Sequence, residues 1–210
     1  MNKFIATLMI FCSVWLTGCS DDYYTDGGIL DNEIGKLNTT TMGYLESKPA
    51  QFDTLTKLIH ICGLVNDVNK QGNTFFVPQD YSIHNYFELI FPEGKWPQLS
   101  ELTEEEIEEI TQILKNYIIP NEEVVREKLS PTYSFGTTLG SKKARYNLVR
   151  EDYLGNVNMG ASWIMYSLDT STEEQPRERF QSARVVTSGL RSTNGIVHVL
   201  VADSHIFGFK

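Results

Sequence analysis

Residues 72–87 read Gly-Asn-Thr-Phe-Phe-Val-Pro-Gln-Asp-Tyr-Ser-Ile-His-Asn-Tyr-Phe, and the hydrophobic period changes in the middle of this stretch. The run 74–77, which contains Phe75 and Phe76, is short and continuous and therefore predicts a buried strand. Pro78 cannot donate a hydrogen bond to a strand ladder, so we expect the strand to end there.

A helix is predicted directly after Pro78. Asp80, or Gln79 beside it, is expected to open this helix, because short polar side chains are favoured where a helix begins. The apolar residues that follow recur at helical spacing, namely Ile83, Tyr86, Phe87 and Ile90. Strand, proline and helix together form the nucleus from which the rest of the fold is predicted.

A second helix is predicted before this nucleus. Ser47-Lys48-Pro49 marks its start, since proline is favoured in a first helical turn. Gly63 followed by Leu64 marks its end, because glycine readily adopts the left-handed conformation that terminates helices. The histidine at position 60 points away from the apolar face, which consists of Phe52, Leu55, Leu58, Ile59 and Cys62.

A third helix begins at Thr103, which forms a capping-box pattern with Glu106 ahead of an apolar face that runs to Tyr117. Six glutamates lie between Glu101 and Glu109. They suggest either a calcium site or a basic partner, or else a solvated first turn. The solvated turn is favoured, because carboxylates stabilise a helix N-terminus and calcium loops need alternating Asp or Asn with a Gly.

The second half of the chain reads mainly as β-structure. Residues 137–149 predict a β-hairpin punctuated by Gly136 and Gly140. Residues 157–167 predict a further pair of strands. Residues 169–179 are polar and charged, so they predict a surface loop.

Apolar runs resume at residues 184–186 and 196–201. Asn194-Gly195 lies between them and predicts a tight turn, because both residues tolerate positive φ.

Three of these motifs resemble the signatures of fasciclin (FAS1) domains. The segment around Pro78 resembles the first signature, Lys-Asn-Tyr-Ile-Ile-Pro at residues 115–120 the middle one, and Asn-Gly-Ile-Val-His-Val-Leu at residues 194–200 the last. The resemblance covers residues 42–207. It implies that the segment ahead of Pro78 packs against the arm that returns through Asn194-Gly195. The residues that match the motifs are Phe75, Phe76, Pro78, Asp80, Tyr117, Asn194, Gly195 and His198.

The resemblance implies an α+β, FAS1-like fold: a compact β-sandwich or wedge of short strands with several helices packed at its front half. It places a single such domain over residues 41–210. Ile118 stands where the middle signature has histidine. In animal relatives the Tyr-His segment is implicated in integrin adhesion, so the resemblance does not carry that activity to this chain.

The amino terminus resembles the signal peptide of a bacterial lipoprotein. Lys3 precedes an apolar run that is too short to span a bilayer, and Leu-Thr-Gly-Cys follows at residues 16–19. This resemblance implies cleavage after residue 18 and acyl chains on Cys19, which would hold the protein to a membrane because two or three chains anchor firmly. The alternative is an ordinary secretory signal with a chance cysteine.

Residues 19–40 show no sustained period and predict a flexible tether with a reach of about 25 Å. Its first residues, Ser20, Asp21 and Asp22, resemble the export signal that sends lipoproteins of Bacteroidetes to the cell surface. The two aspartates are alternatively no more than solvated tether residues. The first interpretation places the protein on the outer membrane, lipid-anchored and exposed on the cell surface.

Composition excludes some partners. The 210-residue chain is 41% hydrophobic, enough to bury a core, and its formal net charge of −9 argues against a nucleic-acid ligand. Cys62 is the one cysteine in the body of the chain and is expected to be a small buried hydrophobe.

We expect no enzyme, no metal and no cofactor. No nucleophile elbow, zinc-protease, Walker or dinucleotide motif occurs. His198 sits in a Val- and Leu-rich strand and is expected to be a hydrogen-bonded core histidine. The run 203–205 contains Asp, Ser and His, but neighbours on an extended chain face opposite ways, so they are expected to be polar residues at a strand end. A small carbohydrate-active enzyme stays the less favoured alternative, because glycosidase carboxylates leave little local signature.

Binding is therefore the favoured activity. Two tryptophans are candidate stacking faces for sugars: Trp96, in a Pro- and Gly-rich loop, and Trp163. Three tyrosines are further candidates, although they are alternatively core residues, namely Tyr146, Tyr153 and Tyr166. The leading hypothesis is an accessory subunit of an outer-membrane glycan or peptide uptake complex, in which a TonB-dependent transporter of the starch-utilisation type and its lipoproteins are the partners. The alternative is an adhesin for host or neighbouring cells.

Overall fold

The computed structural model describes residues 35–91, 98–155, 157 and 160–210. The predicted signal peptide, Cys19, the export residues Ser20, Asp21 and Asp22, and Trp96 all lie outside the described residues. Gly35–Lys210 forms one compact unit.

The described strands form one seven-stranded sheet with the order β2-β1-β7-β6-β5-β4-β3. The sheet is mixed, because β1 and β7 run parallel whereas the other neighbours run antiparallel. The strands are β1 (Asn73–Val77), β2 (Ile118–Ile119), β3 (Ser134–Thr137), β4 (Lys143–Arg150), β5 (Ser162–Asp169), β6 (Phe180–Arg191) and β7 (Gly195–Leu200).

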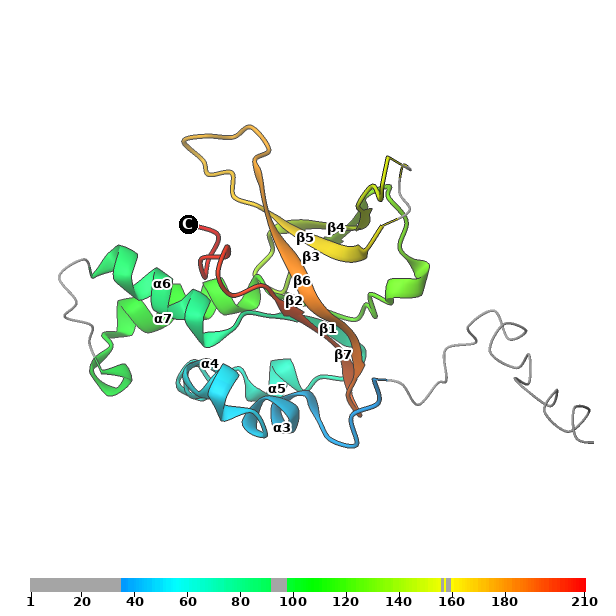
Figure 1. The fold of residues 1–210 in the computed structure, drawn as a ribbon. Helices are drawn as coiled ribbons and strands as arrows, with labels where there is room; N and C mark the ends of the chain where they lie inside the picture. The colour runs from blue at the N-terminus through cyan, green and yellow to red at the C-terminus, as the bar shows by residue number, and fades with distance from the viewer. Residues whose placement is uncertain (1–34, 92–97, 156, 158–159) are drawn as a thin grey trace, which may run out of the picture. The chain divides into compact units, whose positions relative to one another are not determined.

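The described helices all precede residue 129. All but the last of them gather on one side of β1 and β7, and β3, β4 and β5 lie on the other side (Figure 1). The helices are α3 (Thr41–Glu46), α4 (Pro49–Ile61), α5 (Val65–Val68), α6 (Asp80–Ile90), η2 (Leu99–Glu101), α7 (Glu104–Lys115) and η3 (Arg126–Lys128). This arrangement confirms the predicted α+β, FAS1-like fold.

The long strand β6 joins the two halves of the sheet. Its first part, Phe180–Arg184, pairs with β5, and its second part, Val185–Arg191, pairs with β7. The register shifts between Val185 and Thr187 and again between Thr187 and Leu190. Because such bulges bend and twist a strand, β6 turns the sheet from one half into the other.

The strand–proline–helix nucleus is confirmed. All five residues of β1 are buried, and α6 begins at Asp80, two residues after Pro78. On α6, Ile83, Tyr86 and Phe87 face the core, whereas Ile90 at the end of the helix is 38% exposed. Of the four apolar residues at helical spacing, Ile90 is thus the one that does not belong to the buried face.

The helix before the nucleus ends as predicted. The Leu64 N–H donates to the Ile59 carbonyl at 3.0 Å and the Gly63 N–H to the His60 carbonyl at 3.1 Å. Gly63 has a φ of +67°. These two hydrogen bonds form a Schellman motif, which satisfies carbonyls that the helix leaves free.

The predicted hairpin at residues 137–149 is confirmed in part. β3 pairs antiparallel with β4, but β3 begins at Ser134 and contains Gly136, so the first strand of the hairpin lies mostly ahead of the predicted stretch. The predicted strand pair at 157–167 is wrong. Within that stretch the structure has the single strand β5, which continues to Asp169. Its partners β4 and β6 both lie outside the stretch, so no local pattern could show the pairing.

The folded body begins ahead of the boundary expected at residue 41. The Leu37 N–H donates to the Arg191 carbonyl at 2.7 Å, and Lys36 forms a parallel bridge with the same residue. Residues 35–40, predicted as the last part of the tether, thus contact β6. Helix α3, which directly follows, is too short for its period to be read from the sequence.

Candidate functional site

The first and last signature segments lie side by side in the interior. β1 pairs with β7 along its whole length, from Asn73 opposite Gly195 to Val77 opposite Val199. All six residues of β7 are buried. The expected contact between the segment ahead of Pro78 and the returning arm is therefore confirmed.

Phe76 occupies the centre of this interior. Its ring stacks on Tyr166 with centroids 4.1 Å apart and on His198 with centroids 5.1 Å apart. Phe75 is 2% exposed. Tyr146 and Tyr166 are buried as well, so of the three tyrosines named as stacking candidates only Tyr153 lies on the surface.

His198 is fully buried, and both of its ring nitrogens are hydrogen-bonded. Nδ1 accepts from the Gly189 N–H at 3.1 Å, and Nε2 lies 2.8 Å from the Val124 carbonyl oxygen. Since a carbonyl can only accept, Nε2 carries the proton and the imidazole is neutral. Burial lowers the pKa of His198 from 6.5 to about 4, which keeps it neutral at physiological pH. The side chain thus links β7 to β6 and to the loop that contains Val124.

Tyr117 forms a second buried polar contact. Its hydroxyl lies 2.9 Å from His205 Nε2 and accepts from the Gly208 N–H at 2.8 Å. Burial lowers the pKa of His205 to about 4 and raises that of Tyr117. His205 is 3% exposed, so the prediction that it is a polar residue at a strand end is wrong. The chain after β7 folds back over Tyr117 and covers it with Phe207 and Phe209.

Asn194 and Gly195 do join β6 to β7, but the predicted reason is wrong. Neither has a positive φ. Instead the Asn194 side chain connects three segments: Oδ1 accepts from the Thr41 N–H at 2.8 Å, and Nδ2 donates to the Val68 carbonyl at 3.3 Å. A Cβ on Gly195 would lie 2.2 Å from the Asn73 carbonyl oxygen. Asn194 therefore contributes through the hydrogen bonds of its side chain. Gly195 contributes because it has no Cβ and so allows β1 to approach closely.

Asp80 caps a helix other than its own. Phe52 has non-helical dihedral angles and interrupts α4 near its start. The N–H groups of Thr54 and Leu55, just after this break, donate to the two Asp80 oxygens at 2.9 Å each. Because a helix start leaves N–H groups without intrahelical partners, Asp80 stabilises the main part of α4 from outside.

The sequence-predicted motif residues are thus brought together as structural elements of the core. The remaining predicted binding residue, Trp163, lies elsewhere, on β5. It belongs to what we call the outer face: the side of β3–β6 that faces away from the tyrosine-rich core. The register of these strands places on it Phe135, Thr137, Lys143, Arg145, Asn147, Val149, Trp163, Met165, Ser167, Asp169, Phe180, Ser182 and Arg184. Tyr133, just ahead of β3, joins them because its ring stacks on Arg145.

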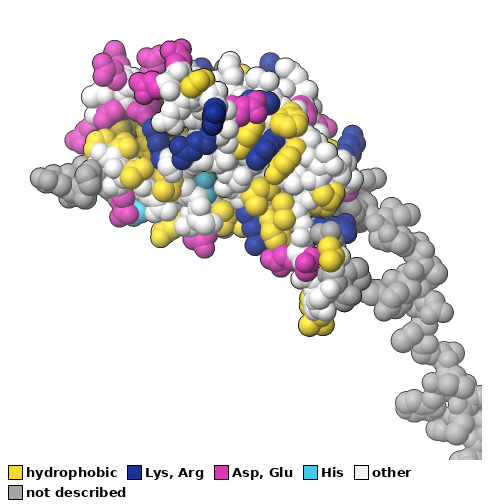
Figure 2. Space-filling view, turned by 90° about the horizontal axis from the view of Figure 1, so that it is seen from above, with side chains coloured by type: hydrophobic (Ala, Val, Ile, Leu, Met, Phe, Trp, Pro, Cys, Tyr) yellow, Lys and Arg dark blue, Asp and Glu magenta, His cyan; other side chains and the backbone are white. Residues whose placement is uncertain are grey.

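Aromatic and cationic side chains alternate on the outer face. Phe135 is 56% exposed and Tyr133 is 44% exposed, and Arg184 is exposed. Figure 2, which looks from above onto the side where β4 and β5 lie, shows hydrophobic and Lys or Arg side chains interleaved in one band. The hairpin predicted at residues 137–149 indicated part of this face, but no sequence pattern showed which strands would complete it.

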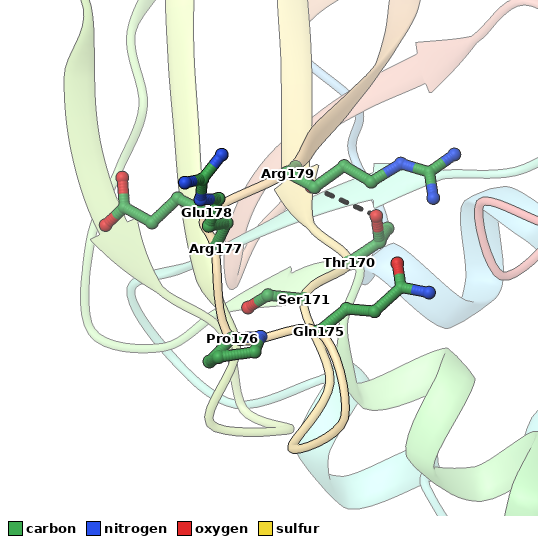
Figure 3. A pocket seen from close by; sticks show the side chains of 7 residues that line it. All are labelled: Thr170, Ser171, Gln175, Pro176, Arg177, Glu178 and Arg179. Carbon is green, nitrogen blue, oxygen red and sulfur yellow. Dashed lines mark hydrogen bonds between the residues drawn. The ribbon is translucent and has the colours of Figure 1, made fainter.

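A pocket of about 420 Å³ lies within the loop that joins β5 to β6. It is lined by residues 170–171 and 175–179, and the Thr170 hydroxyl donates to the Arg179 carbonyl at 3.0 Å across its mouth (Figure 3). Glu178 and Arg179 extend to opposite sides of the loop (Figure 3). Since the charged groups do not converge, this pocket is a poor candidate for a ligand site.

Within the described ranges, no cluster of three or more His, Cys, Asp or Glu side chains is suited to hold a metal ion. Among the same residues, no helix combines the length and the apolar character needed to cross a bilayer. Cys62 is half-buried, and its Sγ lies 3.9 Å from the Ile107 carbonyl oxygen.

The comparison with protein-family models agrees with the motif resemblance. The Fasciclin domain model matches residues 50–202. Among solved structures, the chain is similar to a FAS1 domain pair from the insect cell adhesion molecule fasciclin I, with 16% identity and a TM-score of 0.47. That match covers 74% of this chain and 45% of the other, so the chain spans less than half of the domain pair. A search of curated proteins gave no match.

Proposed function

Because the chain belongs to the fasciclin domain family, we propose that it is a non-enzymatic interaction module, displayed at the cell surface by acyl chains on Cys19. One observation carries this proposal. The family motifs serve internal packing, since β1 and β7 are buried along their whole length. Recognition then falls to the exterior, and the outer face offers the aromatic and cationic groups that binding surfaces use.

The anchor is tested by fractionation. Wild-type protein is expected in the outer-membrane fraction and accessible to protease added to whole cells. Cys19→Ser is expected to leave the membrane fraction, because it removes the atom that carries the thioether. Asp21→Asn together with Asp22→Asn is expected to keep the anchor but lose protease accessibility. A Cys19→Ser protein that stays in the membrane would contradict the proposed anchor.

The finer role that we propose is that of an accessory subunit of an outer-membrane nutrient uptake complex. Its support is the lipoprotein and surface-export pattern of residues 16–22, because small lipoproteins with this pattern accompany transporters of the starch-utilisation type. The test is purification of the full chain in mild detergent. We expect a TonB-dependent transporter and its lipoproteins to co-purify, and an isolated monomer would count against this role.

Adhesion to host or neighbouring cells is the second candidate, favoured by the exposed aromatic side chains of the outer face. It is distinguished by a deletion strain. Loss of attachment with unchanged growth on polymeric nutrients supports adhesion, whereas the reverse supports uptake. A product released from any glycan by the purified protein would contradict a non-enzymatic role.

A further inference from the structure

Two guanidinium groups are stacked on aromatic rings of the outer face. The Arg145 Cζ lies 4.1 Å from the ring centroids of both Tyr133 and Phe180, and the Arg184 Cζ lies 4.1 Å from the Trp163 ring. Stacking fixes the plane of a guanidinium while leaving its edges, which carry the N–H donors, free to bind. The outer face therefore holds two donor groups in fixed orientations.

These two guanidinium groups have no acidic partner among the described residues. The third cation of the face, Lys143, is paired with Glu178 at 2.5 Å. The buried Asp169 carboxylate is also occupied, since one of its oxygens accepts from the N–H groups of Ser171 and Arg179. Two arginines thus lie on this face without a salt bridge among the described residues, in a chain whose net charge is −9. This local charge favours an anionic ligand.

The outer face also gathers unpartnered polar atoms. Of the described residues, the buried side-chain atoms without a hydrogen bond are Arg145 Nε, Asn147 Oδ1 and Trp163 Nε1, and all three belong to this face. Because Asn147 Nδ2 donates to the Pro131 carbonyl at 3.1 Å, Oδ1 is the atom left over. Native proteins pair most buried polar groups, so three exceptions on one face indicate a polar ligand.

The mixture of donors and acceptors narrows the ligand chemistry. Arg145 Nε and Trp163 Nε1 need acceptors, but Asn147 Oδ1 needs a donor. Carboxylates or phosphates alone supply acceptors only. A hydroxylated ring supplies both, and its apolar face also suits the exposed rings of Tyr133 and Phe135.

The sheet surface between the two guanidinium groups, which we call the floor, carries short polar side chains. Ser167 lies opposite Arg145, and its hydroxyl is hydrogen-bonded to that of Ser182 at 2.8 Å. Arg184 follows Ser182 on the same face of β6. Strand spacing and rise place the α-carbons of Arg145 and Arg184 about 12 Å apart. An extended chain of sugars can cross this floor with one charged group at each arginine.

We propose that the outer face binds an acidic polysaccharide, with Arg145 and Arg184 on its carboxylates, Asn147 on a hydroxyl and the exposed aromatic rings on sugar faces. This inference rests on the proposed interaction role and names the ligand class for it. The three unpartnered atoms are buried in the free protein, so binding has to uncover them.

The test uses the full chain purified in mild detergent and measures binding to polygalacturonate by affinity electrophoresis. Dextran serves as the neutral polysaccharide and poly-L-glutamate as the acidic peptide. We expect binding to polygalacturonate, weakening with salt, and at least tenfold weaker binding to the other two. The double variant Arg145→Gln, Arg184→Gln is expected to bind polygalacturonate at least tenfold more weakly.

A matched control removes the same charge elsewhere. Arg150→Gln with Arg191→Gln changes two exposed arginines at strand ends, away from the outer face, and is expected to bind as wild type. Arg184→Gln alone is the variant of choice if the double variant unfolds, since Arg184 is exposed; it is expected to weaken binding several-fold. Far-ultraviolet circular dichroism checks the fold of each variant.

Three results would overturn the inference. The first is that wild type binds none of the polymers, and the second is that the folded arginine variants bind polygalacturonate as wild type does. The third is that poly-L-glutamate binds as tightly, which would point to an acidic protein partner instead. None of these results touches the anchoring and co-purification experiments. Failure of the ligand assignment is therefore distinguishable from failure of the proposed function.

Discussion

Gly195→Ala tests the packing of β1 against β7. The added Cβ would lie 2.2 Å from the Asn73 carbonyl oxygen and 3.2 Å from its carbonyl carbon. Real Cβ contacts essentially never fall below 3.0 Å, so the strands must separate by about 0.8 Å at least. The neighbouring hydrogen bond from the Gly72 N–H to the Asn194 carbonyl, at 2.8 Å, lies directly beside the clash.

Overpacking of this kind costs about 1–3 kcal/mol, and loss of one backbone hydrogen bond adds about 1 kcal/mol. Alanine restricts the unfolded chain more than glycine does, which offsets about 0.5 kcal/mol. We therefore expect Gly195→Ala to lower the free energy of unfolding by about 2–3 kcal/mol. With a urea m-value of about 2 kcal/mol per M, the unfolding midpoint falls by about 1 M.

The matched control is Gly72→Ala. A methyl group on Gly72 would have no atom within 4 Å, but Gly72 has a φ of +78°, so its substitution carries only the conformational cost of a left-handed residue, about 1 kcal/mol. Urea unfolding of both variants is followed by circular dichroism. The packing argument fails if Gly195→Ala costs no more than Gly72→Ala.

Three further predictions concern buried polar groups. Burial lowers the pKa values of His198 and His205 from 6.5 to about 4, so on acidification the unfolded chain takes up protons before the folded chain does. Stability that is present above pH 6.5 is therefore lost as the pH falls toward 4, by on the order of 3 kcal/mol per histidine. Urea unfolding of His205→Gln should show a smaller loss than wild type over this range. Tyr117→Phe leaves the His205 ring nitrogen and a backbone N–H without a partner and should lower the unfolding free energy by about 2–3 kcal/mol; a change below about 0.5 kcal/mol in urea unfolding would show that this hydroxyl is dispensable. Asp80→Ala leaves two N–H groups of α4 without a partner and should lower the free energy of unfolding by about 2–3 kcal/mol. Asp53→Ala removes a surface ion pair and should lower it by at most about 1 kcal/mol. Equal shifts of the thermal unfolding midpoint for the two variants would contradict the capping role.

The local elements of the fold could be predicted because they depend on near neighbours in sequence. The run at 74–77, the break at Pro78, the capping box at Thr103 and the stop at Gly63 each rest on backbone rules that act within a few residues. The motif resemblance added the pairing of β1 with β7, two strands that are far apart in the chain and have no local signal for each other.

The candidate binding surface was predicted only in part. Trp163 was named as a stacking residue and residues 137–149 as a hairpin, but the outer face also needs β6, whose register with β5 no pattern reveals. The role of Asn194 was missed for a similar reason. Its side chain bonds residues 41 and 68, far away along the chain.

The sequence by itself determined where helices and strands begin and end, because capping, turn preference and hydrophobic period are properties of adjacent residues. Only the tertiary structure decided which polar groups are used inside and which face outward. That division depends on contacts between segments far apart in the chain, such as His205 on Tyr117 and Arg145 between Tyr133 and Phe180. Burial and hydrogen bonding are set by such contacts, so no reading of neighbours along the chain could supply them.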